Sequence, residues 1–315
     1  MKRLLCALVV LSWVSSVGAR VRADYVYTTL DVPGATATQP VGINNAMQIV
    51  GAFSVGGVLL PSHGFLLSGG AYAQLDVPGT VSGTIASGIN ASAQIVGYNS
   101  GSGFLLTGGN YTPINVPSSW ASPVQATMAN GINDSGQIVG GYSFVGGGRP
   151  PQLVAGGFLL SGGSYTDLGT VGGSAAHAIN NVGQIVFAFG VLSRGTFMTL
   201  SVPGASLTDA WGINNLGQVV GVYSNNLQGL PDHGFLYNDG TYTTFDVPGS
   251  ISTEARGIND NGQIVGYYTD TAGNEHGFLA TPTPEPSTLV LLGCGVLGII
   301  ACGWRKWRVF RGVSV

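Results

Sequence analysis

One short segment recurs six times along the chain, and this repetition constrains the fold more than any other feature. In its last copy, residues 257–266 read Gly-Ile-Asn-Asp-Asn-Gly-Gln-Ile-Val-Gly. Every copy has Ile-Asn in the same place and a glutamine six residues after its start, and the copies begin at Gly42, Gly88, Gly131, Ala178, Gly212 and Gly257. The spacing is 34 to 47 residues, which is typical of one propeller blade per repeat.

The blocks of one repeat are typical of four short strands. Residues 255–259 and 263–268 are rich in β-branched and aromatic side chains, and the Asn-Asp-Asn-Gly between them is a hairpin signal. A Gly-Phe-Leu block supplies a third strand, and a block ending in Asp-Val-Pro-Gly supplies a fourth, because proline cannot continue a ladder. The sequence therefore predicts an all-β, six-bladed β-propeller-like repeat domain over residues 24–281.

The two ends of this domain are complementary in sequence. Residues 25–32 match the fourth-strand block, whereas the domain ends at a third-strand block, residues 276–280, with no fourth strand after it. Because an unpaired sheet edge promotes aggregation, we expect residues 25–32 to pair beside residues 277–280 and to complete a sixth sheet. The fourth repeat is short and lacks Gly-Phe-Leu, so residues 197–200 are predicted to merge two strands.

The N-terminus has the parts of a secretory signal. Lys2 and Arg3 precede an apolar stretch, and small residues precede two cleavage points, after Ala19 and after Ala23. We predict a signal peptide over residues 1–23, helical in form and exported through the Sec translocon. A retained membrane anchor is the alternative, but eleven apolar residues are too few to cross ~30 Å of hydrocarbon as a helix.

The C-terminus also has three parts. Residues 282–288 contain the motif Pro284-Glu285-Pro286, and residues 289–304 form an uncharged run that predicts a transmembrane helix. Residues 305–315 form a basic cytoplasmic tail, whose first cations are Arg305, Lys306 and Arg308. An ordinary short C-terminal anchor is the alternative.

Two resemblances follow from these motifs. The C-terminal parts resemble the PEP-CTERM sorting signal of Gram-negative bacteria, which implies recognition by an exosortase-type transpeptidase. The repeats resemble the extracellular HAF repeat family: His63, His233 and His276 precede Gly-Phe as in that family, whereas Ser102 and Gly156 depart from it. The resemblances imply a protein of the outer surface or the extracellular matrix with a transient or retained membrane anchor, and they supply no biochemical activity.

Charge restricts the partners of the exported body. Between residues 24 and 280, three arginines oppose thirteen Asp and Glu residues, a net charge of −10. Capture of nucleic acid requires clusters of Lys and Arg, so a nucleic-acid partner is excluded. The body also contains no cysteine, so it folds without disulfides.

The candidate site residues are three aspartates and three histidines at recurring repeat positions. Asp31, Asp76 and Asp246 precede Val-Pro-Gly, and His63, His233 and His276 precede Gly-Phe. We interpret them as structural, with ligand contact as the alternative. No catalytic, cofactor-binding or metal-binding residue is predicted, and the Asn-containing turns carry too few carboxylates for calcium.

The predicted function is therefore that of an exported repeat protein, not an enzyme, acting as a structural or carbohydrate-binding module with extracellular polysaccharide as partner. Tyrosines recur at positions 72, 111, 165 and 242, where they suit either sugar contact or core packing. The alternatives are a secreted glycosidase or lyase using acidic residues on one propeller face, and a protein-binding adhesin. A deep pocket with two carboxylates within ~10 Å would favour the enzyme, and a shallow aromatic face would favour carbohydrate binding.

Overall fold

The computed structural model describes residues 25–56, 63–80, 83–120, 124–146, 152–171, 175–226 and 232–283, and every regular element in them is a strand. Residues 26–281 form one compact unit. A first strand, β1 (Tyr25–Leu30), precedes the repeats. The first three repeats contain β2 (Ala37–Ile43), β3 (Ile49–Ser54), β4 (His63–Ser68), β5 (Ala71–Leu75), β6 (Thr84–Ile89), β7 (Ile95–Asn99), β8 (Ser102–Thr107), β9 (Asn110–Ile114), β10 (Val124–Ile132), β11 (Ile138–Gly146), β12 (Gln152–Ser161) and β13 (Ser164–Gly169).

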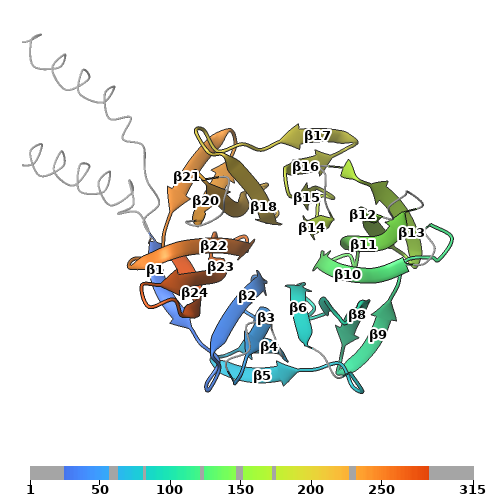
Figure 1. The fold of residues 1–315 in the computed structure, drawn as a ribbon, viewed down its shortest axis with the longest axis horizontal. Helices are drawn as coiled ribbons and strands as arrows, with labels where there is room; N and C mark the ends of the chain where they lie inside the picture. Colours follow the sequence, from blue (N-terminus) through green and yellow to red (C-terminus); the bar gives the residue numbers. More distant parts are fainter. Residues whose placement is uncertain are drawn as a thin grey trace, which may run out of the picture. The chain divides into compact units, whose positions relative to one another are not determined.

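The last three repeats follow the same order. They contain β14 (Ala176–Ile179), β15 (Ile185–Phe187), β16 (Gly190–Ser193), β17 (Thr196–Thr199), β18 (Leu207–Ile213), β19 (Val219–Ser224), β20 (Asp232–Asn238), β21 (Thr241–Phe245), β22 (Ser250–Ile258), β23 (Ile264–Asp270) and β24 (Glu275–Pro282). Within each repeat, consecutive strands pair antiparallel, and the first strand lies nearest the centre of the propeller arrangement (Figure 1).

The prediction of six separate blades is wrong. Four repeats form separate four-stranded blades, which start at β6, β10, β14 and β18, but the first and last repeats share one eight-stranded sheet. They join because β2 lies beside β24, where Ala37 and Glu275 form a parallel bridge. A hydrogen bond of 2.7 Å from Gln39 Nε2 to Glu275 Oε1 reinforces the junction.

The two predicted helices fall outside the part of the chain that the structure describes. The segments predicted as a signal helix, residues 1–23, and as a transmembrane helix, residues 289–304, lie outside the described residues. Among the residues that the structure does describe, no helix is long and apolar enough to cross a membrane.

The N-terminal strand closes the ring of sheets. β1 pairs with β24, which confirms the predicted pairing, although β24 also pairs with β2, so no separate sixth sheet forms. Leu30 and Val32 are 9% exposed in the core cluster beside this junction. Tyr27 packs edge-on against Phe278 of β24, with ring centroids 6.2 Å apart.

A glycine–phenylalanine pair occupies the core of every repeat. In five repeats the glycine lies on the second strand, opposite the Gly-Phe-Leu phenylalanine of the third, as Gly51 lies opposite Phe65. A Cβ on Gly51 would lie 2.8 Å from that ring and 2.1 Å from the Gln39 carbonyl oxygen, so no larger residue fits there.

The short fourth repeat keeps this pair, but the phenylalanine lies on the second strand and the glycine on the third. Phe187 on the second strand lies opposite Gly190 on the third, and Phe187 is fully buried. The predicted merging of two strands at residues 197–200 is wrong, because β16 and β17 remain separate and tight turns absorb the missing length.

Candidate functional site

The inner strands surround a central cavity of about 290 Å³. Each inner strand contributes the residue before the Gly-Ile-Asn segment, and these residues differ in all six repeats: Val41, Ser87, Asn130, His177, Trp211 and Arg256. The glycines beside them allow the strands to approach, since a Cβ on Gly42 would lie 2.9 Å from the Ser87 carbonyl oxygen of the next repeat.

Every one of these six cavity residues is the extra residue of a β-bulge. On β18, for example, Ala210 pairs with Gly221 and Gly212 pairs with Val220, which leaves Trp211 without a partner residue in the ladder. The same register shift occurs on the inner strands of the other five repeats. A bulge re-aims the side chain that it releases from the ladder, and bulges are frequent beside functional sites. The fold therefore points one variable side chain per repeat at the cavity.

A ring of isoleucines forms the floor of the cavity. The ring lines both this cavity and a smaller polar one of about 80 Å³ below it, and its members are Ile43, Ile89, Ile132, Ile179, Ile213 and Ile258. Below the isoleucines, six asparagines form a closed hydrogen-bonded circle: each Nδ2 donates to the backbone oxygen of the asparagine in the next repeat, in the order Asn44, Asn90, Asn133, Asn180, Asn214, Asn259 and back to Asn44.

The same asparagines also form hydrogen bonds within the turn of their own repeat. Asn259 Nδ2 donates to Gln263 Oε1 at 2.8 Å, and Asn259 Oδ1 accepts the amides of Asn261 and Gln263. The Asn-x-x-Gly segment was interpreted as turn chemistry, and these bonds show how the asparagine shapes the turn. Among the described residues, no group of three or more His, Cys, Asp and Glu side chains could hold a metal ion.

Arg256 lies on one side of the cavity in an ion pair. Its Nη2 donates to Glu254 Oε2 and to the Tyr267 hydroxyl, and Tyr267 in turn donates to Glu254 at 2.7 Å. Only 15% of the Arg256 side chain is exposed. Burial raises the pKa of Tyr267 above its usual value, so this hydroxyl stays protonated. The guanidinium is therefore a fixed charge on the cavity wall.

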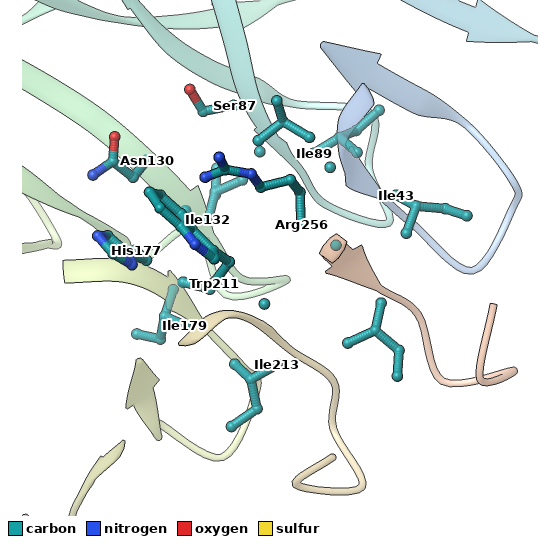
Figure 2. A pocket seen from close by; sticks show the side chains of 18 of the residues that line it. Ile43, Ser87, Ile89, Asn130, Ile132, His177, Ile179, Trp211, Ile213 and Arg256 are labelled. Carbon is teal, nitrogen blue, oxygen red and sulfur yellow. The ribbon is translucent and has the colours of Figure 1, made fainter. Parts of the chain in front are cut away.

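Trp211 lies between Arg256 and His177 (Figure 2). The guanidinium carbon is 3.8 Å from the centre of the indole ring, and the imidazole stacks at 4.0 Å and 4°. Both faces of the indole are thus covered, so Trp211 presents its edge, and not a face, to the cavity. Burial lowers the pKa of His177 to about 4, so the imidazole is neutral. Its Nδ1 donates to the Ala210 carbonyl oxygen at 2.8 Å, which leaves Nε2 as an acceptor.

The six histidines and aspartates named from the sequence come together as three pairs. Nδ1 lies within 3.0 Å of a carboxylate oxygen in His63–Asp76, His233–Asp246 and His276–Asp31. Each pair fastens the third strand of a repeat to the end of a fourth-strand block, and none of the six lines the central cavity. The structural interpretation of these six residues and the alternative of ligand contact both stay predictions.

His276 has a second carboxylate nearby, which makes the closure sensitive to pH. Burial disfavours the charged imidazole, but the hydrogen bond and charge of Asp31, and then Asp270 at 3.5 Å, outweigh burial and raise the pKa of His276. A raised pKa stabilises the fold at pH values below the unfolded-state pKa of about 6.5. This stabilisation is lost as the pH rises through the folded-state pKa. We expect His276→Gln to lower the thermal midpoint at pH 6 but not at pH 8.

The loss of unfolding free energy in His276→Gln at pH 6 should be less than about 1 kcal/mol, because the Asp31 carboxylate is 45% exposed and water screens the pair. Thermal unfolding of wild type and variant in paired buffers measures it. An equal difference at both pH values would contradict the assignment.

The recurring tyrosines pack on the core. Tyr72, Tyr111, Tyr165 and Tyr242 each lie edge-on or tilted against the buried phenylalanine of their own repeat, with ring centroids 5.3–5.9 Å apart. They do not line the central cavity. The sorting residues Pro284, Glu285 and Pro286 and the basic residues Arg305, Lys306 and Arg308 lie outside the described residues.

Sequence reasoning did not name the cavity residues. The available signal was that one position differs in all six repeats, while the Ile-Asn beside it never changes. A bulge depends on the register between two paired strands, and the sequence pattern of one strand does not reveal that register.

One solved structure supports the fold, and a family model supports the sorting signal. A crystal structure of a protein of unknown function from Dyadobacter fermentans DSM 18053 is similar, with a TM-score of 0.50 and 11% identity over 83% of this chain and 99% of that one. A triple arginine-to-alanine mutant of AofleA from Arthrobotrys oligospora gives a TM-score of 0.44 and 10% identity over 81% and 86% of the two chains. No curated protein matches the chain.

One family model, described as the PEP-CTERM protein-sorting motif, matches residues 282–306. The match covers the predicted Pro-Glu-Pro core and the run after it, but not the repeats, so the resemblance to HAF repeats stays a prediction. The chain carries a PEP-CTERM signal, which implies sorting by exosortase-type machinery to the cell envelope or the extracellular space.

Proposed function

We propose that the exported body is a carbohydrate-binding module of the extracellular matrix that holds one sugar unit in its central cavity. The observation that carries this proposal is the contrast within each inner strand. The Ile-Asn that builds the floor and the polar ring is the same in all six repeats, whereas the bulged residue facing the cavity is different in each. A ring built only for stability would need no such difference.

The cavity wall supplies the chemistry that a sugar requires. Hydroxyl groups both donate and accept, and they leave a pyranose ring in several directions. The wall offers the Ser87 hydroxyl, the Asn130 amide oxygen, the His177 acceptor and the Arg256 guanidinium, each from a different strand. The Asn130 Nδ2 already donates to the Ala176 carbonyl oxygen at 2.8 Å. A volume of about 290 Å³ is at the lower end of small-molecule pockets, which suits a single ring.

We propose binding and not catalysis. A glycosidase needs one carboxylate free to act as base or nucleophile and another to act as acid. Glu254 is already engaged by Arg256 and Tyr267, and an ion-paired carboxylate is a weak base. We expect no release of reducing ends when the protein is incubated with polysaccharide from its own culture.

Filling the cavity tests the proposal. Ser87 lines the cavity on β6, so Ser87→Phe should abolish binding of monosaccharides measured by calorimetry. Ser92→Phe is the matched control, because Ser92 lies on an exposed turn of the same repeat. Equal affinity for sugars in both variants would place binding elsewhere, and no binding to the wild type would remove the proposal.

We also infer that the chain leaves the cytoplasm through the Sec translocon and is held by its C-terminal segment in the membrane of a Gram-negative bacterium until an exosortase acts. The order of Pro284-Glu285-Pro286, apolar run and basic cluster supports this. Mass spectrometry of surface protein should find chains that end near residues 283–288. Intact C-terminal segments in a host with an exosortase would contradict it.

A further inference from the structure

The central cavity is closed at its floor. The six isoleucines that form the floor are each only 6–8% exposed, so little space is left between their side chains. Beyond them lies the polar cavity of about 80 Å³, which is too small for a sugar ring, because sites for small molecules begin at about 300 Å³. A ligand that fills the central cavity therefore cannot continue past the isoleucines.

The inner strands also close the cavity at its sides. At each of the five glycines next to the bulged residues, a Cβ would lie 2.9–3.4 Å from the Cα atom of the next repeat. At Gly42, for example, it would lie 3.2 Å from the Cα atom of Gly88. Contacts this short mean that the backbones of neighbouring inner strands are close-packed. A sugar chain cannot pass between them.

The cavity is open to solvent, and among the described residues the remaining opening is the end where the inner strands begin. Gln39 and Ile85 line this mouth, and each lies two residues before the bulged residue of its own strand, Val41 or Ser87. Because a strand rises about 3.3 Å per residue, the bulged side chains lie roughly 6 Å deeper than the mouth. The polar groups that the proposed function requires are thus deep in a pocket with one entrance.

This shape restricts which unit of a polysaccharide can enter. An internal unit carries two glycosidic bonds, so the chain must both enter and leave its binding site. A unit at the end of a chain, or at the tip of a branch, carries one such bond. A unit that reaches Ser87, Asn130 and Arg256 has a single way out for the rest of the chain, through the mouth. An internal unit could only lie across the mouth, away from these groups.

On the basis of the proposed function, we infer that the central cavity recognises the terminal sugar unit of a polysaccharide chain or branch. The terminal ring rests on the isoleucine floor, and its hydroxyl groups meet the polar side chains of the wall. The rest of the chain leaves through the mouth beside Gln39 and Ile85. The amount of protein that a polysaccharide binds therefore depends on the number of its ends and not on the length of its chains.

Fragmenting the polysaccharide tests the inference with the unaltered full-length protein. Polysaccharide purified from the producing culture is divided in two, one half is fragmented by ultrasound, and the terminal units of both samples are counted by methylation analysis. The protein bound at saturation to equal masses of the two samples is then measured by analytical ultracentrifugation. Fragmentation that doubles the number of terminal units should double the protein bound per milligram of polysaccharide.

The outcomes separate this inference from the proposed function. Bound protein that stays the same per milligram while the terminal units double would overturn the inference. If Ser87→Phe abolishes that binding and Ser92→Phe keeps it, the cavity holds internal units and the proposed function stands. Binding that follows the terminal units but survives in Ser87→Phe lies outside the cavity and overturns both. If neither sample binds to the wild type, both fail as well.

Discussion

Deleting residues 25–33 should lower the thermal midpoint of the whole body by about 10 °C. The deletion removes β1 and uncovers the edge of β24, together with the core contacts of Leu30 and Tyr27. Full burial of a large apolar side chain contributes about 1.5–3 kcal/mol, so the loss should exceed about 4 kcal/mol. In a domain of this size, 1 kcal/mol corresponds to roughly 2–4 °C.

Calorimetry of the deleted and intact chains measures this effect. Val26→Ala is the control, because the Val26 side chain is 57% exposed and its removal leaves the β1 backbone in place. A midpoint within 2–3 °C of wild type, roughly the effect of 1 kcal/mol, would show that the ring holds without β1. The exposed edge should also make the deleted chain more prone to aggregate.

Asn259→Ala should destabilise the body by about 3 kcal/mol. The change leaves the amides of Asn261 and Gln263 without their side-chain acceptor, and each unsatisfied buried group costs about 1–3 kcal/mol. It also removes one of the two donors to the Asn44 carbonyl oxygen, which keeps the Met47 amide. Asn259 is 3% exposed, so water cannot readily replace the lost bonds. Because this bond connects the last repeat to the first, the cost should appear as loss of the whole cooperative unit.

Denaturant unfolding of Asn259→Ala against Asn261→Ala measures the cost. Asn261 lies in the same turn but is exposed, and its side chain is not part of the asparagine circle. Asn259→Asp should be at least as destabilising as the alanine variant at neutral pH, because it loses both donor bonds and places a charge opposite a carbonyl oxygen. A loss below about 0.5 kcal/mol for Asn259→Ala would contradict the role of the circle.

Local features of the fold could be predicted, and contacts between repeats could not. The turn residues after Asn259 and the alternation of the flanking strands depend on near neighbours, so the four-strand repeat followed from the sequence. The partner of β1 followed as well, because β1 matches the fourth-strand block that the last repeat lacks. The shared eight-stranded sheet depends on Ala37 approaching Glu275 across the ring. No pattern within one repeat encodes that approach.

The fourth repeat shows why a missing motif misled the prediction. Its Gly-Phe-Leu block is absent, but the core needs only one phenylalanine opposite one glycine. Phe187 and Gly190 satisfy that need from exchanged strands. In this repeat the phenylalanine precedes the glycine along the chain, whereas in the other five the glycine comes first. The pair can therefore be recognised only when the register between the two strands is known.

The paired histidines and aspartates could be predicted from the sequence, whereas the central cavity could not. All three histidines and their three aspartates were named, and the constant separation of 13 residues in His63–Asp76 and His233–Asp246 could have identified them as pairs. The cavity was not predicted, because its side chains come from six bulges whose positions depend on pairing. Arg256 and Trp211 belong to different strands, and only the ring brings them together.

The place of β24 determines how the body would bear mechanical load. The chain continues from Pro282 into the sorting signal within two residues, so tension from an anchored C-terminus enters the body at the end of β24. That strand is bonded to β23 on one side and to β1 and β2 on the other. A pull along such a strand shears many hydrogen bonds together, whereas a pull on an edge strand peels them one by one. Single-molecule stretching from the C-terminus should therefore show a high rupture force that falls sharply when residues 25–33 are deleted.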